Sequence, residues 1–267
     1  MSVDIIATPR STAWLARANP LAKLAAGMAV TVVLLLSVDW VSALVALALE
    51  CALLPLAGLS IRMLAVRGWP ILVAAVTGAW GTALLAPKTG ELLLSWGPVI
   101  MSSDSLQAGL AIGLRGVAIA LPGIMVLAST DPTDLADALA QKLRLPHRFV
   151  LGALAAMRLV GLLIAEWQTL GMARRARGVG AEPGLFSGLK AQLGQAMALL
   201  VQAVRRASRL AVTMEAKGFG AGERSWARES TYSQVDATVV AAGVLLAAAS
   251  VGAAVMLGTW NPVWRLG

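Results

Sequence analysis

Five long apolar runs alternate with shorter polar segments along this chain. Each run holds about 18–23 residues, and at a rise of 1.5 Å per residue that length crosses a hydrocarbon core of about 30 Å. Pro70 stands near the start of the third run, where the first turn of a helix tolerates proline. The pattern predicts membrane-spanning helices at residues 21–38, 41–59, 69–86, 106–128 and 237–258.

The segment between the fourth and fifth runs has a different pattern. Asp131 and Pro132 form a helix start, with Asp131 as the N-cap and proline at the first helical position. Proline and glycine residues then divide the segment into predicted helices at residues 132–143, 147–177 and 188–217. These helices are too apolar to be exposed to water and too often interrupted by charge to be ordinary spans. We expect long amphipathic helices that lie along the membrane surface or against partner proteins.

Composition supports a membrane protein. Of the 267 residues, 58% are hydrophobic and 13% are charged, whereas about 25% are charged in a typical soluble domain. The predicted fold class is an all-α polytopic membrane protein. The single cysteine excludes an internal disulfide and a cysteine-based metal cage, so we expect no bound metal. Three Phe and one Tyr offer few surfaces for base stacking, so we expect no nucleic-acid partner.

The distribution of charge orients the predicted spans. The net charge is +8, and residues 131–232 hold fourteen Lys and Arg against eight Asp and Glu. Cytoplasmic segments carry an excess of Lys and Arg, so we expect this segment and the N-terminus in the cytoplasm. The chain then divides into an N-terminal membrane region at 1–130, a cytoplasmic region of long amphipathic helices at 131–232, and a C-terminal span with an outer tail at 233–267.

Two similar tripeptides end the two long helices of the cytoplasmic region. They are Ala176-Arg177-Gly178 and Ala216-Lys217-Gly218, forty residues apart, flanked by the supporting residues Arg174, Arg175, Met214, Glu215 and Phe219. A structural interpretation is a helix cap, in which a cation offsets the negative end of the helix dipole and glycine takes the left-handed conformation. A functional interpretation is a docking point, because a cation at a helix tip can reach a carboxylate of a partner. The two interpretations are compatible.

Two charged residues lie inside predicted spans. Glu50 and Arg115 each stand near the middle of an apolar run, where a charge is costly and seldom without a role. Either they pair and join the second span to the fourth, or each reaches a membrane surface or a wet interface. In the fourth run, Gly109-x-x-x-Gly113 is a small-residue face that can seat another helix closely, and internal packing is its favoured interpretation.

Several stretches together indicate a family. They are Asn19-Pro20-x-x-Lys23, the segment from Ser129 to Leu139, Met157-Arg158-Leu159-Val160 with Glu166 downstream, Arg205-Arg206-Ala207-Ser208-Arg209, and the two tripeptides with the residues before them. In this order and over nearly the whole length, the chain resembles the transmembrane T component of energy-coupling-factor (ECF) transporters, the EcfT/CbiQ family.

The resemblance implies a function in ATP-driven import. In that family two Ala-Arg-Gly motifs end coupling helices that dock on two cytoplasmic ATPases, and a small substrate-binding membrane subunit carries a vitamin or a transition-metal ion. We therefore expect a multi-pass protein of a prokaryotic cell membrane with no catalytic residues and no cofactor of its own, and ATP on the partner subunits. Lys217 departs from the usual arginine. It keeps the charge and loses the two-pronged fork, so the second contact is expected to be looser.

Two other classes remain as alternatives. An intramembrane enzyme would need a catalytic constellation within the spans, yet Glu50 is the single acid in its run and His147 is the single histidine of the chain. A self-contained secondary transporter would show paired repeats with broken helices at the midplane, whereas the repeated feature here lies in the predicted cytoplasmic region.

Overall fold

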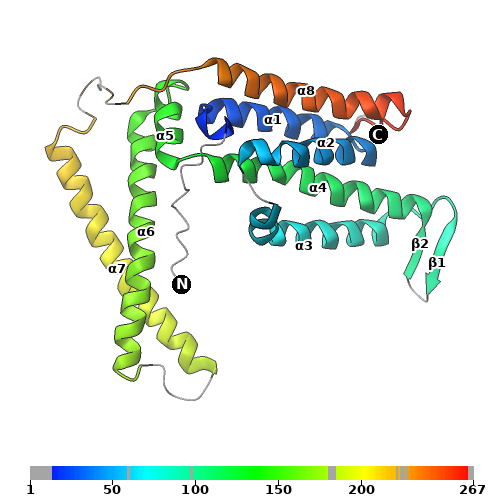
Figure 1. The fold of residues 1–267 in the computed structure, drawn as a ribbon. Helices are drawn as coiled ribbons and strands as arrows, with labels where there is room; N and C mark the ends of the chain where they lie inside the picture. Colours follow the sequence, from blue (N-terminus) through cyan, green and yellow to red (C-terminus); the bar gives the residue numbers. More distant parts are fainter. Residues whose placement is uncertain are drawn as a thin grey trace.

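The computed structural model describes residues 14–58, 61–96, 99–179, 185–220, 222, 226 and 228–263. Within them the chain is almost entirely helical, which confirms the predicted all-α polytopic membrane fold (Figure 1). The helices are α1 (Pro20–Leu36), α2 (Trp40–Leu53), α3 (Ile61–Leu85), α4 (Ser103–Ser129), α5 (Pro132–Gln141), α6 (His147–Ala176), α7 (Leu185–Ala216) and α8 (Gln234–Met256), with short 3₁₀ helices at Trp14–Arg17 and Leu54–Ala57.

Four helices form the centre of the membrane bundle. Side chains from α1, α2, α4 and α8 build its core, which consists of Val30, Leu34, Ala46, Ala118, Leu246 and Ala247. The small residues let the backbones approach closely: a Cβ added to Gly243 of α8 would lie 2.6 Å from the Cβ of Ala26 on α1. Figure 1 shows α3 lying along α4 at the side of this bundle.

The structure corrects two details of the predicted spans. Helix α3 begins at Ile61, so Pro70 lies inside the helix and not in its first turn. Membrane helices tolerate interior proline when neighbouring groups satisfy the backbone. Helix α2 ends at Leu53, earlier than expected, because Pro55 follows and the chain continues as a 3₁₀ turn.

A β-hairpin was not predicted. Strands β1 (Leu92–Trp96) and β2 (Val99–Ser102) pair antiparallel and connect α3 to α4. Its short apolar strands are hard to separate from a loop in the sequence, because periodicity is weak over so few residues.

The helices α6 and α7 lie apart from the bundle. Figure 1 shows them crossing one another and running crosswise to α1, α4 and α8. By length and composition α6 is one of four described helices that could cross a membrane, with α3, α4 and α8, while α1 and α2 are shorter. No residue of α6 is buried in the isolated chain. Its direction, and not its hydropathy, distinguishes it from the bundle helices.

The Gly109-x-x-x-Gly113 face packs internally, as expected. A Cβ at Gly109 would lie 2.5 Å from the carbonyl oxygen of Ala79 and 2.9 Å from the Cβ of Ala83, both on α3. A Cβ at Gly113 would lie 3.0 Å from the Cβ of Ala79. The contacts at Gly109 leave no room for a Cβ and those at Gly113 are tight, so the two glycines allow the close approach of α3 and α4.

We predict that Gly109→Ala destabilises the bundle, because the added methyl group forces α3 and α4 apart and overpacking costs about 1–3 kcal/mol. The matched control is Gly123→Ala on the same helix, where an added Cβ has nothing within 4 Å. The measurement is the midpoint of thermal unfolding in detergent. Equal midpoints for the two variants would contradict a tight contact at Gly109.

Candidate docking site on the crossed helices

Helix α6 ends in a glycine cap at the first tripeptide. The N–H of Val179 donates to the carbonyl of Arg174 at 3.0 Å, and the N–H of Gly178 donates to the carbonyl of Arg175 at 2.9 Å. Gly178 has φ +77°, in the left-handed region that favours glycine. These two bonds form a Schellman motif, which satisfies carbonyl groups at the helix end. Arg177 occupies the C-cap position and is exposed.

Helix α7 ends in the same way at the second tripeptide. The N–H of Phe219 donates to the carbonyl of Met214 at 2.9 Å, the N–H of Gly218 donates to that of Glu215 at 2.9 Å, and Gly218 has φ +74°. Lys217 therefore stands at the same place in its cap as Arg177 does and is also exposed. The predicted helix caps are confirmed at both sites, with one backbone geometry.

Neither cap glycine is crowded by a described neighbour. Among the residues that the structure describes, a Cβ added to Gly178 or Gly218 would meet nothing within 4 Å, and Ala176 and Ala216 are exposed. The glycines are therefore required by the backbone conformation and not by a neighbouring atom. Figure 1 shows the C-terminal ends of α6 and α7 at opposite ends of the crossed pair. The chain presents two equivalent cationic tips at well-separated places.

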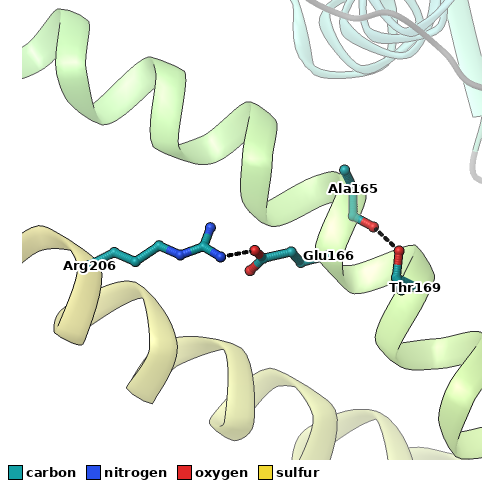
Figure 2. A network of polar contacts seen from close by, with 4 residues as sticks. All are labelled: Ala165, Glu166, Thr169 and Arg206. Atoms are coloured by element: carbon teal, nitrogen blue, oxygen red, sulfur yellow. Dashed lines mark hydrogen bonds and ion pairs between the residues drawn. The ribbon is translucent and has the colours of Figure 1, made fainter.

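An ion pair stands between the crossed helices. Figure 2 shows Arg206 of α7 reaching Glu166 of α6, with the guanidinium Nη2 against the carboxylate Oε1. Nearby, the side-chain amide of Gln195 donates to the carbonyl of Trp167 at 2.7 Å. A Cβ at Gly171 would lie 3.3 Å from the amide of Gln195, so the two helices are close at this point. These polar contacts join α6 to α7 between the two tips.

A polar cluster at one end of the bundle connects it to the rest of the chain. The ammonium group of Lys23, which is buried, donates to the carbonyl of Ser129 at 2.8 Å, at the C-terminal end of α4. The side-chain amide of Asn19 donates to the hydroxyl of Ser230 at 2.9 Å, and its backbone N–H donates to the carboxylate of Asp236 on α8. The ends of α1, α4 and α8 therefore meet in one hydrogen-bonded cluster.

Asn19 and Lys23 were identified in the sequence as residues that carry the family resemblance, but their place in this cluster was not predicted. Asp236 was not identified from the sequence. The one available signal was a pair of polar residues at the very start of an apolar run. Their partners lie more than one hundred residues away in the chain, so no local pattern identifies them.

The short helix α5 is tied to the segment that leads into α8. Arg228 pairs with Asp134 at 3.1 Å, and its carbonyl accepts a hydrogen bond from the side-chain amide of Gln141 at 2.8 Å. Burial raises the pKa of the neighbouring Asp137 carboxyl, while Arg228 opposes that shift. These contacts fix the return of the chain from α7 to the bundle.

Among the described residues the structure shows no ion pair between Glu50 and Arg115, so it favours the alternative in which each charge reaches a membrane surface or a wet interface. The two carboxylate oxygens of Glu50 and the Nε and Nη2 atoms of Arg115 are buried without hydrogen-bond partners. Glu50 lines a cavity of about 110 Å³ together with Pro122 and Lys23. Pro122 follows Arg115 by seven residues, about 10 Å along a helix. The two charges therefore lie at different levels of the bundle.

These features define a polytopic helical membrane protein that displays two cationic, glycine-capped helix ends on a crossed pair of helices. A family profile described as "CbiQ: Cobalt transport protein" matches residues 11–226. The chain therefore belongs to the CbiQ family.

Curated relatives carry a consistent description. The chain is 28% identical over 209 residues to the "Energy-coupling factor transporter transmembrane protein EcfT 1" of Listeria monocytogenes serotype 1/2a (strain 08-5578), covering 75% of this chain and 78% of the relative. It is 30% identical over 174 residues to the EcfT protein of Bacillus subtilis (strain 168), covering 62% of this chain and 66% of the relative. It is 31% identical over 169 residues to that of Bacillus selenitireducens, covering 60% and 63%. The chain is thus an EcfT-type membrane component of an energy-coupling transporter.

We predict that Gly178→Ala and Gly218→Ala loosen the helix ends, because a left-handed conformation costs a non-glycine residue roughly 1–2 kcal/mol. Amide hydrogen exchange in the last turn should speed up by about 5- to 30-fold at the altered cap. Gly152→Ala on α6 and Gly188→Ala on α7 are matched controls, since an added Cβ at either has nothing within 4 Å and neither has a positive φ. Unchanged exchange at both caps would contradict the Schellman geometry.

We also predict that the Glu166–Arg206 pair sets the angle between α6 and α7. Because the two side chains are 26% and 35% exposed, solvent screening keeps the pair modest in energy, so geometry should change before stability does. Spin labels at Arg175→Cys and Glu215→Cys, in a Cys51→Ser background, report the distance between the tips. Glu166→Arg should broaden the distance distribution, and the swap Glu166→Arg/Arg206→Glu should restore it.

The control for that experiment is Arg209→Glu, an equal charge reversal at an exposed position of α7. A distribution that broadens as much in this control, or a swap that fails to narrow it, would count against the ion pair.

Proposed function

We propose that this protein is the energy-coupling membrane subunit of an ECF-type importer driven by ATP-binding-cassette ATPases. In this proposal the caps at Arg177 and Lys217 dock on two cytoplasmic ATPases, which bind and hydrolyse the ATP. The bundle holds a small substrate-binding membrane subunit that takes up a vitamin or a transition-metal ion. The chain itself contributes no catalytic residue, and it lies in a prokaryotic cell membrane with the N-terminus and residues 131–232 in the cytoplasm.

The observation that carries the proposal is the repetition of one cap with a cation at its C-cap position; α8 ends in the same glycine turn but has Leu257 there. Two helix ends with the same hydrogen bonds, the same left-handed glycine and an exposed cation at the same position fit a partner with two equivalent subunits. The name of the curated relatives, energy-coupling factor transporter transmembrane protein, supports this role. A single capped helix would not favour it, because glycine and a basic residue are common at helix ends.

The crossed helices suit the transmission of movement. If each ATPase holds one tip, a change in the distance between the ATPases acts on α6 and α7 at opposite ends. The contacts at Glu166 and Gln195 make the pair pivot as a unit. The cluster around Lys23 and Asn19 then carries that movement into α1, α4 and α8. In this scheme the chain acts as a lever between the ATPases and the substrate-binding subunit.

Cobalt is the substrate that the family description favours, since the matching profile is described as a cobalt transport protein. The names of the EcfT relatives mention no substrate. Uptake of labelled cobalt, compared with uptake of labelled vitamins by the same cells, separates the two classes.

We predict that Arg177→Ala/Lys217→Ala leaves the protein folded in the membrane but weakens its association with the ATPases. Truncating one partner of a desolvated charge pair costs about 2–5 kcal/mol, so the double variant should lose at least about tenfold in affinity. The measurement is the amount of ATPase, identified by peptides of its nucleotide-binding loop, that co-purifies with the tagged chain.

The control is Lys88→Ala, between α3 and the β-hairpin, at the end of the bundle away from the crossed helices (Figure 1). It removes a cation and its two hydrogen bonds to the carbonyls of Ala83 and Leu84, so any effect should stay at that end of the bundle. Normal co-purification and normal uptake in the double variant would refute docking at the two caps. If the unfolding midpoint falls in the double variant but not in the control, the loss of ATPase co-purification would be assigned to misfolding.

A further inference from the structure

The two caps share a backbone geometry but differ in the side chains beside them. In the first cap the N–H of Val179 donates to the carbonyl of Arg174. In the second cap the corresponding bond runs from the N–H of Phe219 to the carbonyl of Met214. Both of these residues are apolar at the second tip, whereas at the first the guanidinium of Arg174 lies toward α7, where a Cβ added to Gly194 would be 3.1 Å from its Nη2. Two partners that dock on these tips meet different surfaces.

The second cap also borders a preformed hollow between α6 and α7. The hollow measures about 540 Å³, and its apolar lining includes Leu151 and Leu154 from α6 and Leu210 and Met214 from α7. The segment after the cap closes one end: the ring of Phe219 meets the ring of His147 edge to face at 6.4 Å, and the guanidinium of Arg148 donates to the carbonyl of Gly220. These contacts fix the segment after the second cap, which contributes Phe219 to the lining of the hollow.

Two cations face this hollow from different helices. Arg158 of α6 and Lys217 of α7 both line it, both are exposed, and none of the residues that line it is an acid. Among the described residues neither side chain has a hydrogen bond or an ion pair with an acid. Two uncompensated positive charges at the rim of an apolar hollow fit a partner segment that brings carboxylates together with an apolar side chain.

We propose that Arg158 and Lys217 form a two-cation clamp at the second docking site, and that the hollow between them seats an apolar side chain of the ATPase segment that docks there. This inference rests on the proposed function. The occupant is assigned to the ATPase because the hollow is continuous with the second cap, where Lys217 and Gly218 belong to both. Lys217 lacks the planar guanidinium that binds a carboxylate through two hydrogen bonds. Arg158 supplies that group, so the second site can still make a bidentate contact.

The test isolates the second site in the background of Arg177→Ala. The full-length chain in detergent is titrated with the purified ATPase subunits that co-purify with the wild-type protein. Arg158→Ala should weaken binding about tenfold or more, Arg158→Glu should abolish it, and Arg158→Lys should keep most of it because the charge remains. The affinity in the parent background should also fall as ionic strength rises.

The charge-matched control is Lys190→Ala, an exposed cation near the opposite end of α7. The inference is overturned if Arg158→Ala binds the ATPases as well as Lys190→Ala does. It is also overturned if Arg158→Ala keeps the ATPases but loses a co-purified small membrane subunit or a bound anionic lipid, because the hollow then serves another occupant. If the wild-type chain binds no ATPase at all, the proposed function fails and the inference fails with it.

Unfolding midpoints of all variants separate docking from folding. Arg158 is exposed and its side chain supports no described hydrogen bond, so Arg158→Ala should unfold at the same temperature as the parent. A variant such as Gly109→Ala, which is destabilised within the bundle and leaves the clamp intact, should retain ATPase affinity while folded. Loss of affinity in Arg158→Ala without loss of stability supports the clamp.

Discussion

The last carbonyl groups of a helix have no partner within the helix, and this protein satisfies them in part with side chains and in part with glycine turns. At the end of α4 the buried ammonium group of Lys23, from α1, donates to the carbonyl of Ser129. At the ends of α6 and α7 the chain turns back on itself through a left-handed glycine. A helix end capped by another helix is fixed in the bundle. A helix end that caps itself needs no other element and can stand exposed. Helix α8 ends in the same turn at Gly258 but has Leu257 at its C-cap, so the cations Arg177 and Lys217 distinguish the ends of α6 and α7.

Small residues impose a second constraint. Lipid tails are as apolar as side chains, so membrane helices gain little from hydrophobic burial and depend on close backbone contact. Gly109 and Gly113 bring α4 against α3, and Gly243 brings α8 against α1. The bundle built in this way has few large buried side chains, yet its helices are held at distances that allow no added methyl group at Gly109 or Gly243.

In the proposed function, the similarity of the two tips fits a partner with two equivalent subunits, and their differences offer each subunit a different surface. Both tips present a cation at the C-cap. The first carries additional arginines on its own helix, and the second shares a hollow with Arg158 of the neighbouring helix. The strength of docking at the second tip therefore depends on Arg158 as well as on the lysine that replaces arginine in the second tripeptide.

The sequence by itself determined the helices and their caps, because apolar runs, Asp131-Pro132 and the glycines after residues 177 and 217 act within a few positions of the chain. Their order and chemistry also indicated the family. Only the tertiary structure decided which charges meet. Glu50 and Arg115 stand at different levels of the bundle, Lys23 reaches Ser129, and Glu166 meets Arg206. Such contacts depend on how far each helix is shifted along and rotated about its axis relative to its neighbours. Close backbone packing sets those shifts, and no local pattern records them.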